Sequence, residues 1–239
     1  DKLEHEHTTE AIQERISGAQ NSYLRDWIYG GIDGTITTFA VVSGVAGAGL
    51  SPVIVLILGF ANLIADGFSM AAGNFLGTRA EQDSYKNLEE IERKHIELAP
   101  DGEREEIRQI YLQKGFKGEE LETVVRLITS DKQRWIDAML SGEYGLPLSI
   151  RSPLKAAGST FTAFVICGFI PLVPYVFTKT LGFEASALLT GGVFFLIGSV
   201  KSRWTNSSWY RSGFETFLVG AFAASLAYFA GVLLKDLVL

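Results

Sequence analysis

Two aspartates stand in a long apolar part of the chain. From Trp27 to Thr78, Asp33 and Asp66 are the only acidic or basic residues, apart from the phenol of Tyr29. A carboxylate at membrane depth costs roughly a few kcal/mol unless it is paired, protonated or placed in a wet cavity. We therefore interpret both aspartates as groups on the path of a cation. The alternative is that each is a structural acid bonded to a neighbouring helix.

Asn62, Asp66 and Met70 recur at intervals of four residues. In a helix this spacing places an amide, a carboxylate and a thioether on one face. Hard oxygen together with softer sulfur suits a borderline divalent transition metal better than magnesium or calcium. We expect this face and Asp33 to line a transport pathway. For Met70 taken alone, the alternative is an ordinary core methionine.

The charged middle of the chain holds a second set of candidate ligands, arranged in pairs one helical turn apart. Side chains with this spacing point in one direction, so three helix surfaces could converge on one metal ion. The alternative is a solvated acidic face, which is typical of acidic helices. The candidate metal ligands are Glu92 with His95, Glu103 with Glu106, and Met139 with Glu143.

Other functional classes lack their usual sequence features. No nucleophile with a nearby histidine and acid is visible, and no glycine loop that could cradle a phosphate, so we expect no enzyme and no ATP-driven pump. The net charge of −6, with lysines and arginines scattered among acids, argues against nucleic acid as a partner. We expect no prosthetic group, and a metal ion only as substrate and bound ligand.

The chain is 47% hydrophobic and yet 20% charged, and the two kinds of residue are segregated. This segregation predicts an all-α integral membrane protein with five transmembrane helices and a cytosolic helical metal-binding insert between the second and third. We expect a tail over residues 1–25, helices one and two within 26–78, the insert over 79–151, and helices three to five within 152–239. The five apolar segments are Trp27–Ala48, Pro52–Leu76, Leu154–Phe177, Ala185–Val200 and Phe214–Leu234.

Local signals predict how these helices end. The stretch from Glu81 to Leu98 continues the second membrane helix, and Pro100 begins a new one. Gly115 ends that helix, Asp131 caps a later one, and Gly142 ends the last helix of the insert. Two prolines at 171 and 174 are expected to kink or end the third membrane helix.

The positive charges predict the topology. Nineteen of the 21 lysines and arginines lie in the tail, in the stretch Arg79–Lys155 that contains the insert, and in the loop Lys201–Arg211. Because cytosolic loops carry the excess of lysine and arginine, we expect the N-terminus and the insert in the cytosol. A bacterial inner membrane and a eukaryotic vacuolar membrane fit this orientation equally. Residues 1–20 contain no apolar run, so we expect no cleavable signal peptide.

A series of short motifs, in this order and spacing, resembles the vacuolar iron transporter family. The resemblance covers nearly the whole chain from about Arg25. It rests on Gly31–Gly34, Ala65–Gly73, Pro100–Phe116, Glu143–Leu146, Ser152–Ala157, Pro171–Pro174, Lys201–Thr205 and Ser212–Glu215.

The resemblance implies a five-helix homodimer whose pathway lies between the subunits. Such a protein exports iron(II), and often manganese(II), from the cytosol in exchange for protons. By resemblance, the membrane aspartate and methionine of the family fall on Asp33 and Met70. Its cytosolic ligands fall on Glu92, Glu103, Glu106, Met139 and Glu143.

Three positions depart from the family pattern. Asn62 stands where better-known members carry a membrane glutamate, although Asp66 one turn along could supply the charge. His95 replaces one insert glutamate and still ligates iron, manganese or zinc. Asn74 replaces a glutamate often found beside Gly73. These changes bear on rate, proton coupling and metal preference. The principal alternative function is a membrane-anchored metal buffer or sensor without transport.

Overall fold

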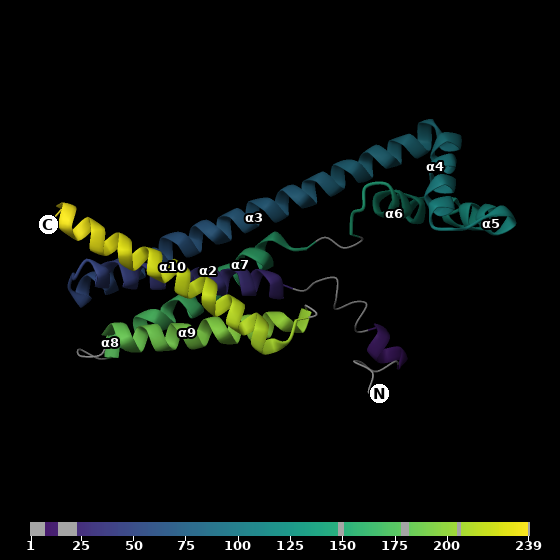
Figure 1. Cartoon of the computed structure of the whole chain (residues 1–239). Helices are drawn as coiled ribbons and strands as arrows, with labels where there is room; N and C mark the ends of the chain where they lie inside the picture. The colour runs from purple at the N-terminus through teal and green to yellow at the C-terminus, as the bar shows by residue number, and fades with distance from the viewer. Residues whose placement is uncertain (1–7, 14–22, 148–150, 178–181, 205–206, 239) are drawn as a thin grey trace. The chain divides into compact units, whose positions relative to one another are not determined.

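The computed structural model describes residues 8–13, 23–147, 151–177, 182–204 and 207–238, and these residues form helices and short connections without a strand (Figure 1). Two compact units emerge. One contains Ser22–Leu76 and Pro153–Leu239, and the other contains Gly77–Ser152. The expected tail over residues 1–25 lies largely outside the described residues.

Within the described residues, four helical stretches are long and apolar enough to cross a membrane, where sequence analysis expected five. They are Pro52–Leu98, Pro153–Phe177, Gly182–Lys201 and Trp209–Lys235. The helix of the first expected segment, α2 (Leu24–Gly47), is not among them. A fifth span would have to be α2, and the surroundings of α2 differ from those of the four candidate spans.

Helix α2 is surrounded by protein. It packs against α7 (Pro153–Phe169), α9 (Gly182–Lys201) and α10 (Trp209–Val238). A Cβ atom on Gly34 would lie 2.3 Å from the Phe164 carbonyl oxygen, and one on Gly47 would lie 2.2 Å from that of Tyr228. Small residues allow membrane helices to approach this closely. Because its neighbours cover it, α2 can carry buried Thr35 and Thr38 in place of large apolar side chains.

Helix α3 (Pro52–Leu98) is continuous over 47 residues, which confirms that the second apolar segment runs on to Leu98. It ends where Ala99 precedes Pro100, because a residue before proline disfavours the helical conformation. In its first part, large apolar side chains are exposed, among them Ile57, Ile64 and Phe68. This face has no cover within the described chain.

The prolines of the third apolar segment act as expected. Helix α7 ends at Phe169, and a 3₁₀ turn η1 (Ile170–Leu172) precedes the short helix α8 (Val173–Phe177). The hydroxyl of Ser186 in α9 donates to the Pro171 carbonyl oxygen at 2.7 Å. A second 3₁₀ turn, η2 (Ser202–Trp204), follows α9.

The insert is a small helical bundle of α4 (Pro100–Gln113), α5 (Gly118–Thr129) and α6 (Lys132–Gly142), together with the end of α3. The expected helix start at Pro100 is confirmed, and so is the Asp131 cap, whose carboxylate accepts from Arg134 N–H at 2.8 Å. Gly115 follows α4 with a φ of 100°, which suits glycine. The buried core is Ile96, Ile107, Leu121, Val125, Trp135, Ile136, Met139 and Leu140.

Substituting Gly34→Ala is expected to destabilise the purified protein by about 1–3 kcal/mol, because the added methyl group meets backbone atoms of α7 that cannot rotate away. Gly192→Ala is the matched control, since a Cβ there meets nothing within 4 Å. Thermal unfolding in detergent should show a lower Tm for Gly34→Ala only. Equal Tm values for the two variants would contradict the close packing of α2 on α7.

Candidate metal centres

A one-residue turn brings the first candidate ligands of the insert together. Helix α3 ends at Leu98 and α4 begins at Pro100, and Ala99 donates its N–H to the His95 carbonyl oxygen at 2.8 Å. Glu92 and Ile96 lie one turn apart on α3, as do Glu103 and Ile107 on α4. Because both isoleucines are in the core, both glutamates are drawn into the bundle with them.

Glu92, His95 and Glu103 form a compact group of potential ligands. One ligand atom of each lies within 4.8 Å of the others. Two ligands on opposite sides of one transition-metal ion stand about 4.4 Å apart, given bonds of 2.0–2.2 Å. The group is therefore close to the size that a metal ion requires. His95 Nδ1 lies 3.6 Å from Glu103 Oε1.

Two of these carboxylates are buried without a donor for each oxygen. Glu92 is 1% exposed and Glu103 is 5% exposed. Among the described residues, Oε2 of neither glutamate accepts a hydrogen bond, whereas Tyr144 donates its hydroxyl to Glu92 Oε1 at 3.0 Å. A buried carboxylate oxygen without a donor is costly, and either a proton or a cation removes that cost.

The pKa of Glu103 reflects the same competition between a proton and a cation for the buried carboxylate. Burial, followed by the negative charges of Glu106 and Glu92, raises the pKa of Glu103 to about 7. A hydrogen bond from protonated Glu103 to Glu92 and the charge of Glu143 act in the same direction. At neutral pH without metal, Glu103 is therefore poised between holding a proton and releasing it to a cation.

Glu106 and Glu143 extend the group outward. Both are exposed, and their charges act on the buried pair. Burial, with the charges of Glu92 and Glu106, raises the pKa of Glu143. Burial and the hydrogen bond to Glu92 raise the pKa of the Tyr144 phenol. The structure therefore groups Glu92, His95 and Glu103, places Glu106 and Glu143 near enough for their charges to act on Glu103, and adds Tyr144, which spacing did not single out.

Met139 is placed differently from the other candidates. Its side chain is fully buried in the apolar core of the insert. The backbone of the same helix end connects it to the acidic group, because Glu143 donates its N–H to the Met139 carbonyl oxygen at 2.9 Å. Its assignment as a metal ligand remains a prediction, since the sulfur packs among hydrocarbon side chains in this structure.

In the other unit, the two aspartates act on each other electrostatically across α2 and α3. Asp33 is half-buried and Asp66 is exposed, and the Asp66 charge acts on the Asp33 carboxylate. One turn from Asp66, Asn62 donates to Thr37 Oγ1 at 3.2 Å, and Thr37 in turn donates to the Asp33 carbonyl oxygen at 2.9 Å. Met70 packs against the apolar core. Asn62, Asp66, Thr37 and Asp33 make a polar strip between α2 and α3 in which oxygen atoms predominate.

A further polar cluster joins α2, α3 and α7. Asp26 is 7% exposed, and Asn74 donates to its carboxylate at 2.9 Å and to Thr160 Oγ1 at 2.7 Å. Sequence analysis singled out Asn74 only as a departure from the family pattern and passed over Asp26. The signal in the sequence was the position of Asp26, about two helical turns before Asp33 and directly before the apolar stretch.

Comparisons with known proteins give one consistent result. The model of the VIT family matches residues 24–232. The chain is 35% identical to "Vacuolar iron transporter 1" of Arabidopsis thaliana, over 86% of this chain and 83% of that protein. It is 33% identical to "Vacuolar iron transporter 2" of Oryza sativa subsp. japonica, over 86% and 85%. It is 31% identical to "Vacuolar iron transporter" of Plasmodium falciparum (isolate 3D7), over 89% and 82%.

In metal-free buffer, Glu103→Gln is expected to stabilise the protein at about pH 8 by about 1–3 kcal/mol and to leave it unchanged at about pH 4. Folding raises the pKa of Glu103 from 4.5 to about 7, so the folded state binds this proton more tightly. The resulting stability is complete below the unfolded pKa and is lost as the pH rises through the folded pKa.

The amide in the Glu103→Gln variant does not titrate, so this variant does not lose that stability as the pH rises. Thermal unfolding across the pH range, with a chelator present, measures the effect. Glu90→Gln, at an exposed position of α3, is the control and should follow the wild-type profile. A Glu103→Gln profile parallel to that of the wild type would contradict the assignment.

The same Glu103→Gln substitution is expected to weaken binding of manganese(II) by at least about tenfold, because it removes a negatively charged ligand. Calorimetric titration of the full chain at constant pH provides the measurement. Glu120→Gln, at an exposed position of α5, should bind as the wild type does. Since we expect Glu103→Gln to be the more stable protein without metal, unfolding cannot account for its loss of binding. Unchanged affinity would exclude Glu103 as a ligand.

Proposed function

The chain belongs to the VIT family, and we propose that it is a secondary transporter that exports divalent transition metal from the cytosol in exchange for protons. Iron(II) is the proposed principal substrate and manganese(II) the second, with zinc(II) as a further ion that the insert binds. The observation that carries the proposal is the pair Asp33 and Asp66, two interacting carboxylates in a stretch, Trp27–Thr78, that otherwise lacks acidic and basic residues apart from Tyr29.

The surroundings of Asp66 support a homodimer. Asp66 is exposed on α3, next to apolar side chains such as Ile64 and Phe68 that are also exposed. A carboxylate that faces lipid is costly, whereas one at a subunit seam can face a second carboxylate and a cation. A Cβ on Gly73 or Gly77 meets nothing within 4 Å, so a second α3 has room to approach here. In the proposed dimer, this seam contains the pathway.

Five membrane spans are part of the proposal. Helix α2 lies against three of the helices that are apolar enough to cross a membrane, so its weaker hydropathy follows from its covered position. An odd number of spans places the insert and the C-terminus on opposite sides. The excess of lysine and arginine in the insert then assigns it to the cytosol, with α10 ending on the far side. The relatives named as vacuolar transporters favour a vacuolar membrane, and a bacterial inner membrane would give the same orientation.

Each group has a proposed role in transport. The Glu92, His95 and Glu103 group binds the ion on the cytosolic side, assisted by Glu106 and Glu143. Asp33 and Asp66 replace part of the hydration shell of the ion within the membrane, with Asn62 and Met70 as additional ligands. Protonation of a carboxylate from the acidic side then weakens its hold on the metal and drives release.

Asp33→Asn is expected to reduce uptake of iron(II) into proteoliposomes by at least about tenfold, because the amide keeps the size of the side chain but loses the charge that attracts the cation. An acidic interior should accelerate uptake by the wild type, and a protonophore should remove this acceleration. A metal-sensitive dye inside the vesicles reports the flux. Asp83→Asn, at an exposed position of the insert, is the matched control.

Metal binding by the same variants separates the two candidate functions. Asp33→Asn should bind metal in the insert as the wild type does, although it transports little. Full uptake by Asp33→Asn would refute the assigned pathway. Metal binding by the wild type without any flux would instead favour a membrane-anchored buffer.

A further inference from the structure

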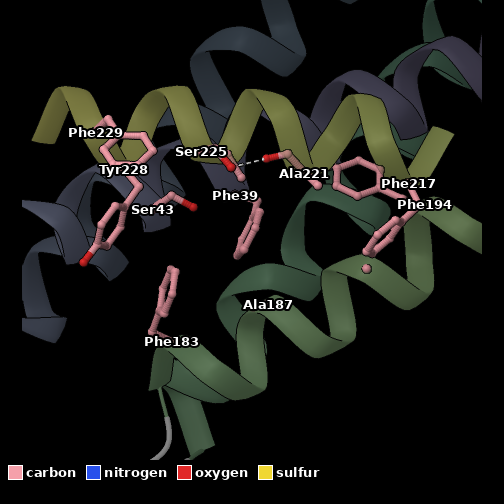
Figure 2. A pocket seen from close by; sticks show the side chains of 12 residues that line it. Phe39, Ser43, Phe183, Ala187, Phe194, Phe217, Ala221, Ser225, Tyr228 and Phe229 are labelled. Carbon is pink, nitrogen blue, oxygen red and sulfur yellow. Dashed lines mark hydrogen bonds between the residues drawn. The ribbon is translucent and has the colours of Figure 1, made fainter. Parts of the chain in front are cut away.

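A cavity of about 400 Å³ lies between α2, α9 and α10 (Figure 2). Aromatic rings line it at both ends, with Phe39, Phe183 and Tyr228 at one end and Phe194 and Phe217 at the other. Its volume is in the range of ligand sites, which is roughly 300–1,000 Å³. Protein interiors rarely contain voids much larger than a water molecule, so a cavity of this size calls for an occupant.

The cavity exists because α9 and α10 are close together at one end and apart at the other (Figure 1). Near the connection between them, a Cβ on Gly198 would lie 2.5 Å from the Ser212 carbonyl oxygen. At the other end, rings fill the space between the helices. The Phe183 ring lies 6.1 Å from that of Tyr228 and stacks on that of Phe39 at 6.2 Å. Packing at both ends therefore holds the middle open.

The lining excludes an ion or a charged ligand. Among the described residues that line the cavity, none is an acid, a base or a cysteine, so they offer none of the ligands that the proposed metal pathway uses. Ser225 already donates to the Ala221 carbonyl oxygen at 2.8 Å. Ser43 Oγ has no partner among the described residues, but a helical serine can rotate to donate to the carbonyl four residues earlier. An uncharged lining matches an uncharged hydrocarbon chain.

The cavity is continuous with the surface that faces lipid. Phe229 lines the cavity and is 68% exposed, and Leu188, next to the lining residue Ala187, is 79% exposed. Both belong to helices that are long and apolar enough to span a membrane. The α9 side runs from Phe183 to Phe194, about 16 Å of helix. One leaflet of the hydrocarbon core is about 15 Å thick, so the cavity has the length of one leaflet.

We propose that this cavity binds one acyl chain of a bilayer phospholipid, which enters sideways between α9 and α10. The chain supplies the dispersion contacts that the aromatic lining lacks when the space is empty. The proposed acyl-chain site shares no residue with the proposed metal ligands, so this proposal holds whichever ion the protein carries.

Photocrosslinking of the full chain tests the site. The protein is reconstituted with phosphatidylcholine that carries a diazirine on its acyl chain, irradiated, and mapped by mass spectrometry. We expect crosslinks at Phe183, Ala187 and Tyr228 in the wild type. Ala187→Trp fills the cavity and should lose most crosslinks at Phe183 and Tyr228. Leu188→Trp, which adds the same ring at the exposed neighbouring position, should keep them.

A second cavity-filling variant distinguishes a blocked site from a misfolded protein. Ala224→Leu fills the cavity from α10 with a smaller side chain and should also lose the crosslinks, while size-exclusion chromatography reports whether each variant is folded. Undiminished crosslinks in either folded cavity-filling variant would overturn the proposal. Crosslinks confined to exposed residues such as Leu188 would show ordinary surrounding lipid and would also overturn it.

Discussion

A carboxylate that is buried away from water needs a proton, a hydrogen-bond donor or a cation to compensate for its lost hydration. This constraint applies in both units of the molecule. In the insert, Glu92 and Glu103 are buried with the isoleucines one turn away, and among the described residues each has one oxygen without a donor. Burial, followed by the charges of Glu106 and Glu92, raises the pKa of Glu103, so a metal ion bound there would displace a proton. In the membrane helices, Asp33 and Asp66 face the same requirement, and the proposed transport of a cation against protons is one way to meet it.

The helix packing follows from what surrounds each helix. Lipid is as apolar as leucine, so membrane helices associate through close contact and polar bonds more than through hydrophobic burial. Helix α2 satisfies this rule with glycines that touch the backbone of α7 and α10. The Asn74 amide likewise joins α2 to α7 by bonding Asp26 and Thr160. An amide at this position can bridge two oxygen atoms, which a carboxylate at the same place could not do without a proton.

Much of the fold could be predicted from the sequence, because its strongest signals act locally. The continuation of α3 to Leu98, the new helix at Pro100 and the cap at Asp131 each depend on residues within one turn. The first apolar segment also forms the expected helix, α2, but it is not among the four helices that are apolar enough to cross a membrane. Hydropathy treats every apolar helix as if lipid surrounded it, whereas α2 is covered by α7, α9 and α10 and needs fewer large apolar residues. Local composition carries no information about such cover.

The sequence by itself determined which residue types were available: two membrane aspartates, an acidic insert, and pairs of ligands one turn apart. Helical periodicity sufficed for this, because it relates residues at most four positions apart. Only the tertiary structure decided that Glu92 and His95 meet Glu103 across the turn at Ala99, and that Met139 lies in the core. It also decided that α9 and α10 separate to leave a cavity. These features depend on the angles between helices, which side-chain packing over the whole unit sets and which no local pattern encodes.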